Sequence, residues 1–269
     1  MSKNRNQARH ARARTRPHSP HIMVSVLSLH ERTGWIHPKL TAEIVRTALS
    51  SGTRYRMTYI PMNGVYPVSA ARNRIVVRHF LPSPADWLCM FDNDIGPPEN
   101  LIEVILTAPP EADIVVLPCW VWCSEGHPMM CFGDLRRVNG KPLMYPQGYT
   151  RLGWHEGGAG GTGAIFIRRR VFRKVKKPYF KFLYDKGEEL AVGEDIYFTA
   201  KARRAGCRIF TNLDFVCSHY RTLDLAEVNA GVNSILGRYV KTAQEKYRAH
   251  GIALPSLNEM LAMKKKKVS

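Results

Sequence analysis

The chain has 269 residues, of which 45% are hydrophobic, as in one packed α/β domain. No run approaches the roughly 20 apolar residues of a membrane span, and no apolar signal-peptide core follows the first residues. This weighs against an integral membrane enzyme and leads us to expect a cytoplasmic protein. The net charge is +18, and it is concentrated near the two ends and between residues 168 and 181. It predicts a polyanionic partner, nucleic acid or an anionic membrane, unless these segments are solvated tails and a basic helix face.

The first half of the chain alternates short apolar runs with amphipathic stretches, after a basic N-terminal tail (1–21) that we expect to be disordered. The pattern predicts strands and helices in turn: strands 22–29, 55–60 (ended by Pro61), 87–91 and 114–117, and helices 40–48, 69–80 and 100–107. This alternation predicts a mostly parallel central sheet with helices on both faces.

The second half is less regular. Residues 119–160 are rich in Gly, Pro and Trp, and we expect long loops there. Strands are predicted at 164–167 and 208–211, a helix at 195–205 capped by Gly206, and an amphipathic helix around 232–240. A second basic tail follows at 264–269, so that residues 22–263 form one domain.

Four residues that bind zinc in other proteins recur at every fourth position: Cys119, Cys123, His127 and Cys131. Gly126 and Pro128 break the helix that would align them, and structural zinc sites usually contain tighter pairs. We therefore favour reduced thiols, as in a cytosolic protein, over a zinc site.

An Asp-x-Asp triplet, Asp92-Asn93-Asp94, directly follows the buried run 87–91. Ligands bind at the carboxyl ends of strands in open α/β sheets, and two carboxylates there suit Mg²⁺ or Mn²⁺ on a diphosphate. A solvated turn in which Asp caps a helix is the simpler alternative.

A second acidic pair, Glu194-Asp195, stands where a helix is predicted to start. Acids at that position suit the helix dipole. They also suit a general base that takes a proton from an acceptor hydroxyl.

Two further features carry weaker signals. His219 follows an apolar run and is either structural or a ligand for Mn²⁺. The loop 160–163, Gly-Gly-Thr-Gly, is either flexible or lets the backbone approach a substrate closely.

In this order, these features resemble the GT-A type glycosyltransferases, glycosyltransferase family 2 in particular, and more loosely their phage-encoded members. The matching segments are residues 23–28, 71–74, 91–94, 161–169, 193–198 and 218–219. The resemblance implies a GT-A (Rossmann-like) fold with a nucleotide-binding half (22–118) and an acceptor-binding half (119–263). It also implies a cofactor, Mn²⁺ or Mg²⁺, and a nucleoside-diphosphate sugar as donor, with a UDP-sugar expected.

The resemblance implies a role for each donor-side residue. Asp94 and His219 would hold the metal against the diphosphate, with Asp92 nearby on the ribose or through water, and Asn93 beside the donor. Three further residues would border the nucleotide: Ser28, His30 and Arg72.

On the acceptor side, the resemblance implies that Asp195 is the catalytic base of an inverting displacement and that Glu194 binds donor or acceptor. Gly161, Gly163 and Trp154 would line the sugar pocket. Residues 29–34 depart from the common Pro-x-Tyr-Asn pattern, which leaves the nucleotide base open. The Gln-x-x-Arg-Trp motif of processive synthases is absent, which favours transfer of one sugar per event.

The basic segments lead us to expect DNA with a hydroxymethylated pyrimidine as the acceptor, bound by phosphate contacts. The expected basic patch consists of Arg168, Arg169, Arg170, Arg173, Lys174, Lys176 and Lys177. The alternatives are an acceptor that is a cell-surface polysaccharide, a lipid-linked sugar or a protein. A non-catalytic nucleic-acid-binding protein and a nucleotidyltransferase are further alternatives. The oligomeric state stays open.

Overall fold

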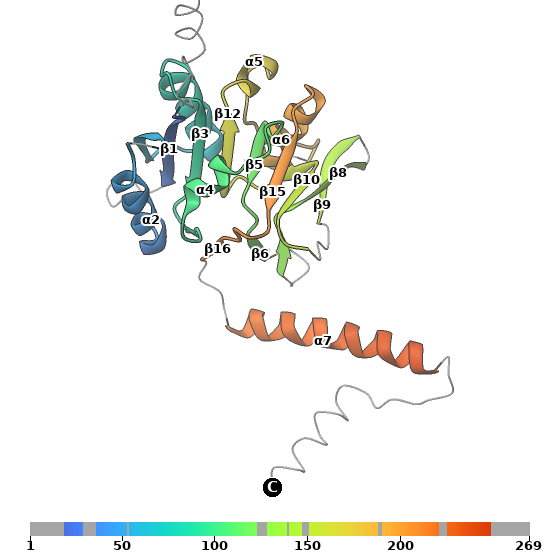
Figure 1. Cartoon of the computed structure of the whole chain (residues 1–269). Coiled ribbons are helices and arrows are strands. Elements are labelled where there is room, and N and C mark those ends of the chain that lie inside the picture. Colours follow the sequence, from blue (N-terminus) through green and yellow to red (C-terminus); the bar gives the residue numbers. More distant parts are fainter. Residues whose placement is uncertain are drawn as a thin grey trace, which may run out of the picture.

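A seven-stranded sheet runs through the centre of the molecule, in the order β10-β15-β5-β12-β3-β1-β2 (Figure 1). The computed structural model describes residues 19–28, 36–52, 54–122, 128–138, 140–146, 151–187, 190–220 and 225–248. The expected tails, apart from residues 19–21, lie outside these ranges, as do His30, Cys123 and His127. The strands of the central sheet are β1 (His21–Ser28), β2 (Arg56–Asn63), β3 (Trp87–Asp92), β5 (Ile114–Val116), β10 (Trp154–Gly157), β12 (Ala164–Arg168) and β15 (Ile209–Asn212).

The direction of the strands confirms the mostly parallel sheet. β2, β1 and β3 run parallel to one another, and β15 runs parallel to β5. β12 lies between β3 and β5 and is antiparallel to both, and β10 is antiparallel to β15. Both sequence halves therefore contribute strands to a single sheet.

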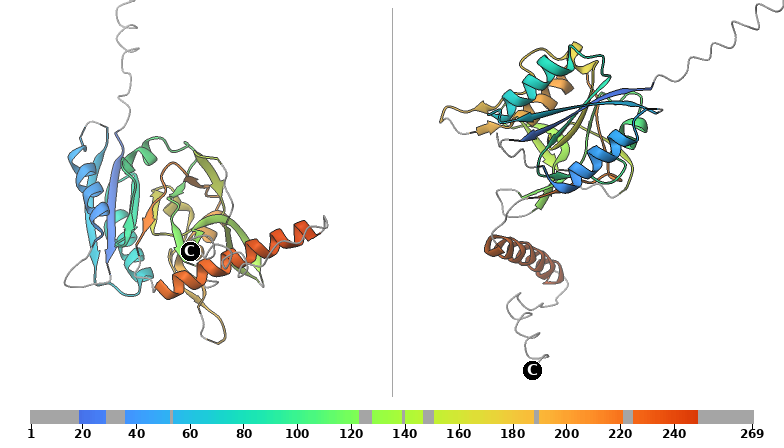
Figure 2. Two further views of the ribbon diagram at one scale, coloured as in Figure 1. Left: turned by 90° about the horizontal axis from the view of Figure 1, so that it is seen from below. Right: turned by 90° about the vertical axis from the view of Figure 1, so that its left-hand side faces the viewer.

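Helices cover both faces of this sheet, as expected (Figure 2). Alternate residues of β3 point to opposite faces: Cys89 and Phe91 pack on one side, Leu88 and Met90 on the other. The first side is covered by α2 (Pro38–Leu49) and α4 (Leu101–Leu106). The second is covered by α3 (Val68–Arg74), its π-helical continuation η1 (Ile75–Phe80), α5 (Val171–Lys174) and α6 (Glu194–Arg204).

The prediction that Pro61 ends the second strand is wrong. β2 continues to Asn63, and Pro61 pairs in register with Val26. β2 is the last strand of the sheet, so the N–H group that proline lacks is not needed on its outer side.

The prediction of long loops over residues 119–160 is also wrong. The chain there forms a hairpin of β6 (Trp120–Trp122) and β7 (Pro128–Met130), and a small sheet of order β11-β8-β9. The strands of this small sheet are β8 (Phe132–Val138), β9 (Lys141–Pro146) and β11 (Ala159–Gly160). β8 and β9 contain Gly and Pro and lie outside the central sheet, and no regular hydrophobic alternation marks them in the sequence.

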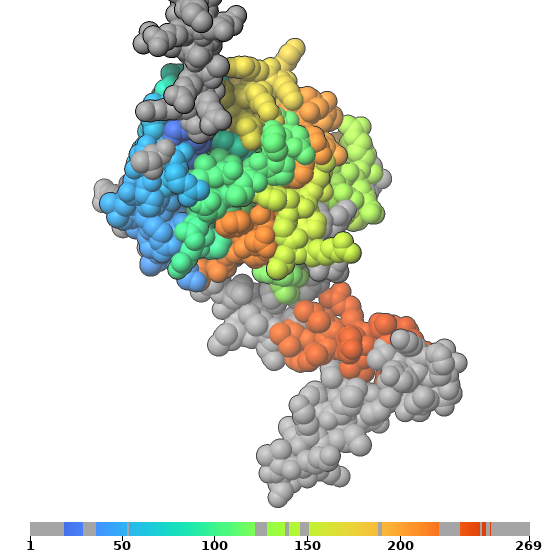
Figure 3. Space-filling model, viewed as in Figure 1, coloured from blue at the N-terminus to red at the C-terminus, as the bar shows by residue number. Residues whose placement is uncertain are grey.

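The last described helix, α7 (Leu225–Arg248), stands beyond the end of the sheet where β6 and β16 (Ser218–His219) lie (Figures 1 and 3). Before α6, the chain also forms a short antiparallel pair of β13 (Leu183–Tyr184) and β14 (Leu190–Val192). Within the part of the chain that the structure describes, no helix is long and apolar enough to cross a membrane.

Candidate functional site

A cavity of about 300 Å³ opens at the carboxyl ends of β1 and β3. This is where an open α/β sheet binds its ligands. Its polar lining consists mainly of residues singled out in the sequence: Ser28, Arg72, Asp92, Asn93, Asp94, Thr162, Glu194, Asp195 and His219, with Gly161 and Gly163. Residues far apart in sequence are thus brought to one place.

The glycine loop reaches the cavity because β12 is antiparallel to β3. The start of β12 therefore lies beside the end of β3, and Ala164 pairs with Phe91. The Asp92 N–H donates to the Gly163 carbonyl oxygen at 2.9 Å. A Cβ on Gly163 would approach the Ile95 Cδ1 atom to 3.0 Å, so even a methyl group there would crowd the turn after Asp92.

Arg72 joins the two acidic motifs. Its guanidinium donates to Asp92 Oδ1 at 2.8 Å, to Glu194 Oε1 at 3.1 Å and to the Thr162 carbonyl oxygen at 3.2 Å. Only 2% of Arg72 is exposed. Burial alone lowers the pKa of Arg72, but the surrounding carboxylates, Asp92 first, raise it above its usual range. Arg72 is therefore a buried cation that holds two carboxylates in place.

Burial raises the pKa of Asp92, although the Arg72 charge acts against this shift. The Oδ1 atom of Asp92 accepts a hydrogen bond from Arg72, so this oxygen is already taken up by a contact within the protein.

Asp94 and His219 meet through a short two-stranded ladder. β4 (Ile95–Gly96) pairs antiparallel with β16, and His219 is opposite Ile95. The His219 Nε2 atom lies 3.2 Å from Asp94 Oδ2. The side chains of Asp94 and His219 are 30% and 11% exposed, so this pair borders the open part of the site.

An aromatic stack fixes this ladder to α2. The rings of His37 and Tyr220 are parallel within 9°, with centroids 3.6 Å apart. The His37 N–H donates to the Asn93 carbonyl oxygen at 2.8 Å, and the Tyr220 N–H to that of Asp94 at 2.9 Å. The sequence analysis missed both residues, because nothing local signals a contact between positions so far apart.

Asp195 is the second residue of α6 (Glu194–Arg204) and lies near the glycine loop. Its Oδ1 accepts from the Ile196 N–H at 2.7 Å, and a Cβ on Gly161 would lie 3.7 Å from its Oδ2. Burial, followed by the Glu194 charge, raises the pKa of Asp195 to about 6, against the Ile196 N–H and the Arg72 charge. A carboxyl group with such a pKa is matched to general-base work near neutral pH.

Two glycines leave room for side chains at the cavity. A Cβ on Gly193 would come within 2.6 Å of Asp195 Oδ1, and one on Gly161 would collide with the Cys131 sulfur. A side chain at Gly193 would therefore displace the Asp195 carboxylate, and one at Gly161 would displace Cys131.

Cys119 and Cys131 also line the cavity, and their thiols interact. This hydrogen bond, followed by burial, raises the pKa of the Cys131 thiol well above its usual range. Both thiols are free, while Cys123 and His127 lie outside the described residues. No group of three or more His, Cys, Asp or Glu side chains within the described ranges is placed to hold a metal ion. Of the three residues expected at the metal, Asp94 and His219 lie 3.2 Å apart, and the charge of Asp94 acts on Asp92.

Trp154 is not at the cavity. It begins β10 at the far end of the central sheet, where it pairs with Asn212, and it packs against the core on the α4 side. The expectation that it lines a sugar pocket finds no support in this position.

The basic segment 168–177 lies at the end of the central strands opposite the cavity. Arg168 pairs with Trp87, the first residue of β3, whereas the cavity is at the last. The Arg169 guanidinium donates to the carbonyl oxygens of Phe80, Leu81, Ser83 and Ala85.

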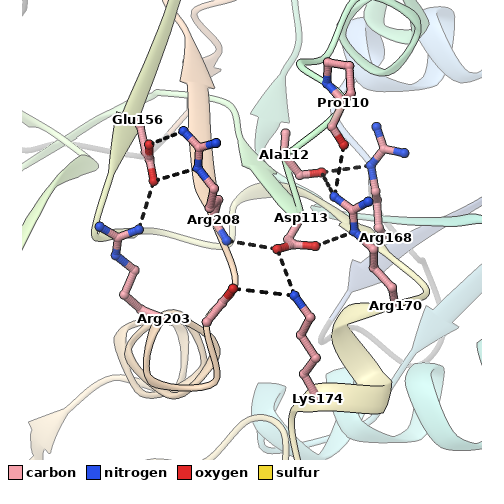
Figure 4. Close-up of polar contacts among 10 residues, drawn as sticks. Pro110, Ala112, Asp113, Glu156, Arg168, Arg170, Lys174, Arg203 and Arg208 are labelled. Carbon is pink, nitrogen blue, oxygen red and sulfur yellow. Dashed lines mark hydrogen bonds and ion pairs between the residues drawn. The ribbon is translucent and has the colours of Figure 1, made fainter.

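The neighbouring cations are held by Asp113 (Figure 4). Asp113 is 3% exposed, pairs with Arg170 and Lys174, and accepts from the Arg208 N–H at 3.0 Å. Arg168, Arg169 and Arg170 are therefore half-buried and contact the protein itself, whereas the other four members of the expected patch are exposed: Arg173, Lys174, Lys176 and Lys177.

No protein-family model matches the chain, and no curated protein matches its sequence. Among solved structures, its fold is similar to that of A197 from STIV, with a TM-score of 0.51 and 17% sequence identity over 75% of this chain and 86% of that one. A weaker likeness is to GalNAc-T7 with UDP, GalNAc and Mn²⁺, with a TM-score of 0.45 and 14% identity over 76% of this chain and 44% of that one. Another is to a glycosyltransferase involved in the glycosylation of the major capsid of PBCV-1, with a TM-score of 0.41 and 13% identity over 79% of this chain and 99% of that one. The first likeness concerns the fold alone, and it agrees with the α/β architecture predicted from the sequence, a mostly parallel central sheet between helices.

Proposed function

We propose that this chain is a metal-dependent glycosyltransferase that moves one sugar, with inversion, from a nucleoside-diphosphate sugar to an acceptor hydroxyl group. The observation that carries the proposal is the convergence, on one cavity at the carboxyl edge of the sheet, of the Asp94–His219 pair and a carboxyl group of raised pKa, Asp195. The first suits a metal and the second a proton acceptor.

The metal ligands of the proposal are Asp94 and His219, which present one carboxylate oxygen and one imidazole nitrogen 3.2 Å apart. Two such donors fit Mn²⁺ or Mg²⁺ if a diphosphate completes the coordination. Asp92 is assigned to Arg72 rather than to the metal, because its Oδ1 already accepts from that guanidinium. A bound divalent ion supplies positive charge to the leaving diphosphate.

Asp195 is the proposed base. In an inverting displacement the acceptor oxygen forms a bond to the anomeric carbon while the bond from that carbon to the diphosphate oxygen breaks. The acceptor proton goes to a carboxylate oxygen of Asp195. Because Oδ1 is held by the Ile196 N–H, we assign this role to Oδ2, which lies toward Gly161.

Arg72 and the glycines support this arrangement. Arg72 holds Glu194, the residue before the base, and Asp92, two residues before the metal ligand. We assign it a positioning role in place of direct contact with the nucleotide. Gly161 and Gly163 let the loop backbone approach the sugar without side chains.

For the acceptor, the charge of the whole chain favours a polyanion, and DNA with a hydroxymethylated pyrimidine is the first candidate from the sequence. The basic segment 168–177 does not strengthen this candidate, because it lies at the edge of the sheet opposite the cavity. A second candidate, a lipid-linked or cell-surface acceptor, is favoured by the exposed apolar face of α7.

The test is a donor screen with Mn²⁺ that follows release of nucleoside diphosphate, with and without hydroxymethylcytosine-containing DNA. We expect one nucleotide sugar to be hydrolysed, with loss of activity in EDTA and in Asp195→Asn. Acceleration by modified DNA, but not by unmodified DNA, is the result expected for a DNA acceptor. Absence of turnover and of binding with every nucleotide sugar would refute the proposed enzyme class.

A further inference from the structure

The helix α7 stands apart from the central sheet and carries an exposed apolar stripe (Figures 1 and 2). Val232, Ile235, Leu236 and Tyr239 are 45%, 39%, 41% and 75% exposed. They follow the spacing i, i+3, i+4, i+7, which places them on one side of a helix.

The sequence of α7 does not favour an isolated helix. Gly231 and Gly237 lie within it, and each lowers the stability of a helix by about 1 kcal/mol relative to alanine. A Cβ on Gly237 would meet nothing within 4 Å, so no close packing requires a glycine there. Most helices in proteins are stabilised by burial of their apolar face, so that a surface covering this stripe would stabilise α7.

We propose that the apolar face of α7 docks the protein on an anionic lipid surface, with the helix lying in the plane of the membrane interface.

The distribution of charge fits a lipid partner. At 100° per residue, Arg238, Lys241 and Arg248 lie on the side of α7 away from the apolar stripe, together with the two acidic residues Glu227 and Glu245. Arg238 and Lys241 are exposed. The sequence beyond the helix adds four consecutive lysines, 264–267. Basic residues opposite an apolar stripe are typical of helices that insert into the headgroup region of anionic membranes.

The shape of the apolar face favours lipid over a second copy of the chain. A coiled-coil seam needs apolar residues every three or four positions over several heptads. Here apolar residues hold the seam positions from Leu225 to Tyr239, about two heptads, and Thr242 and Lys246 take the positions that follow. The stripe is also broad, because Leu236 and Val240 lie beside that seam, and a broad face suits a membrane interface.

The docking would bring the membrane to the functional side of the molecule. α7 follows His219 closely in sequence and lies beyond the edge of the sheet where the cavity opens, whereas Arg168 is at the opposite edge. If the proposed function holds, the acceptor is then a hydroxyl group presented at a membrane surface. The docking itself does not depend on that function.

The test is flotation of the full-length chain with vesicles of phosphatidylcholine, with and without phosphatidylglycerol. We compare wild type with Ile235→Glu/Leu236→Glu on the apolar face. The matched control is Asn233→Glu/Ser234→Glu, which adds the same charge at two exposed positions outside the stripe. Circular dichroism and thermal melting, which need no activity, verify that each variant is folded.

We expect wild type to float with anionic vesicles, weakly with neutral ones, and less as salt rises. The apolar-face variant should lose at least about tenfold in partitioning, since two apolar side chains no longer enter the lipid. The control should lose much less.

Three results would overturn the proposal. The first is no flotation of wild type. The second is equal flotation of both double variants, which would assign binding to the lysines alone. The third is a wild-type dimer that the apolar-face variant converts to monomer without any lipid binding. Donor hydrolysis measured on the same samples separates these outcomes from failure of the proposed function.

Discussion

The Nε–H of Arg72 donates to Glu194 Oε1 at 3.1 Å, across a separation of 122 residues in sequence. The same guanidinium donates to Asp92 Oδ1 at 2.8 Å. The buried Arg72 side chain thus connects Glu194, which directly precedes the proposed base Asp195, with Asp92, two residues before the proposed metal ligand Asp94.

We predict that Arg72→Gln shifts the acid limb of the kcat/KM pH profile of the proposed reaction to higher pH. Asp195 must be ionised to accept a proton, so activity falls as pH decreases through its pKa of about 6. The Arg72 charge lowers that pKa, and its removal raises it. Arg72→Lys keeps the charge and should keep the limb near its original position, while kcat/KM falls. Identical limbs in wild type and Arg72→Gln would contradict the electrostatic role.

Arg72→Gln should also destabilise the fold by about 3–5 kcal/mol, because breaking a buried pair leaves carboxylates without their partner. Chemical denaturation at neutral pH measures this loss. If the free energy of unfolding changes by less than about 1 kcal/mol, the guanidinium is not a structural link between Asp92 and Glu194.

Asp195→Asn should lower kcat by about 10²–10⁴-fold, the usual contribution of a general base, and should leave Mn²⁺ and donor binding unchanged. Rapid-quench kinetics with the best donor measures the first effect and titration calorimetry the second. A matched change at an exposed carboxylate outside the cavity, Asp185→Asn, should have no effect on either. Full activity of Asp195→Asn would remove it as the base.

We predict that Tyr220→Ala weakens Mn²⁺ binding about 10–100-fold, the range seen when residues that orient metal ligands are changed. The Tyr220 ring stacks on His37 and lies against Gly96, next to the ladder that pairs Ile95 with His219. Tyr220→Phe keeps the stack and should bind Mn²⁺ nearly as wild type. Electron paramagnetic resonance of free Mn²⁺ measures the affinities, and equal values for both variants would contradict a positioning role.

At the end of the sheet opposite the cavity, Asp113→Asn should destabilise the protein by about 1–3 kcal/mol at neutral pH. Burial raises the pKa of Asp113, but hydrogen bonds from the Arg208 backbone and from Arg170 lower it by more, so that the net pKa is below its usual value. Stability from a lowered pKa is present above the unfolded value near 3.9 and is lost as pH falls through the folded one. The difference between wild type and variant should therefore shrink below about pH 4. Glu156→Gln, an exposed pair with Arg203 and Arg208, should cost at most about 1 kcal/mol.

Much of the fold and of the candidate site could be predicted from the sequence. Buried strands such as 87–91 are marked by unbroken apolar runs, and polar residues directly after them meet at one edge of a parallel sheet. Asp92 and Asp94 were expected at a ligand site on this ground, and they line one cavity with Ser28, which the family resemblance implied. Glu194 and Asp195 were marked by their position at the start of a helix.

The remaining features depend on contacts that no local pattern encodes. The segment 168–177 is a run of cations in sequence, but backbone carbonyls of residues 80–85 and the Asp113 carboxylate bind several of them. β8 and β9 pair only within a small outer sheet, and their glycine and proline residues interrupt the pattern that marks a strand in the sequence. The His37–Tyr220 stack joins two residues that lie far apart in the sequence.

The most direct test of the proposed function is titration of UDP into wild type and Asp94→Ala by isothermal calorimetry, with Mn²⁺ and with EDTA. We expect binding to wild type that needs Mn²⁺, and affinity at least about tenfold lower in Asp94→Ala at an unchanged melting temperature. Equal affinity in EDTA and in Asp94→Ala would contradict the assigned metal site. No binding of UDP or of any other nucleoside diphosphate to wild type would contradict the account as a whole.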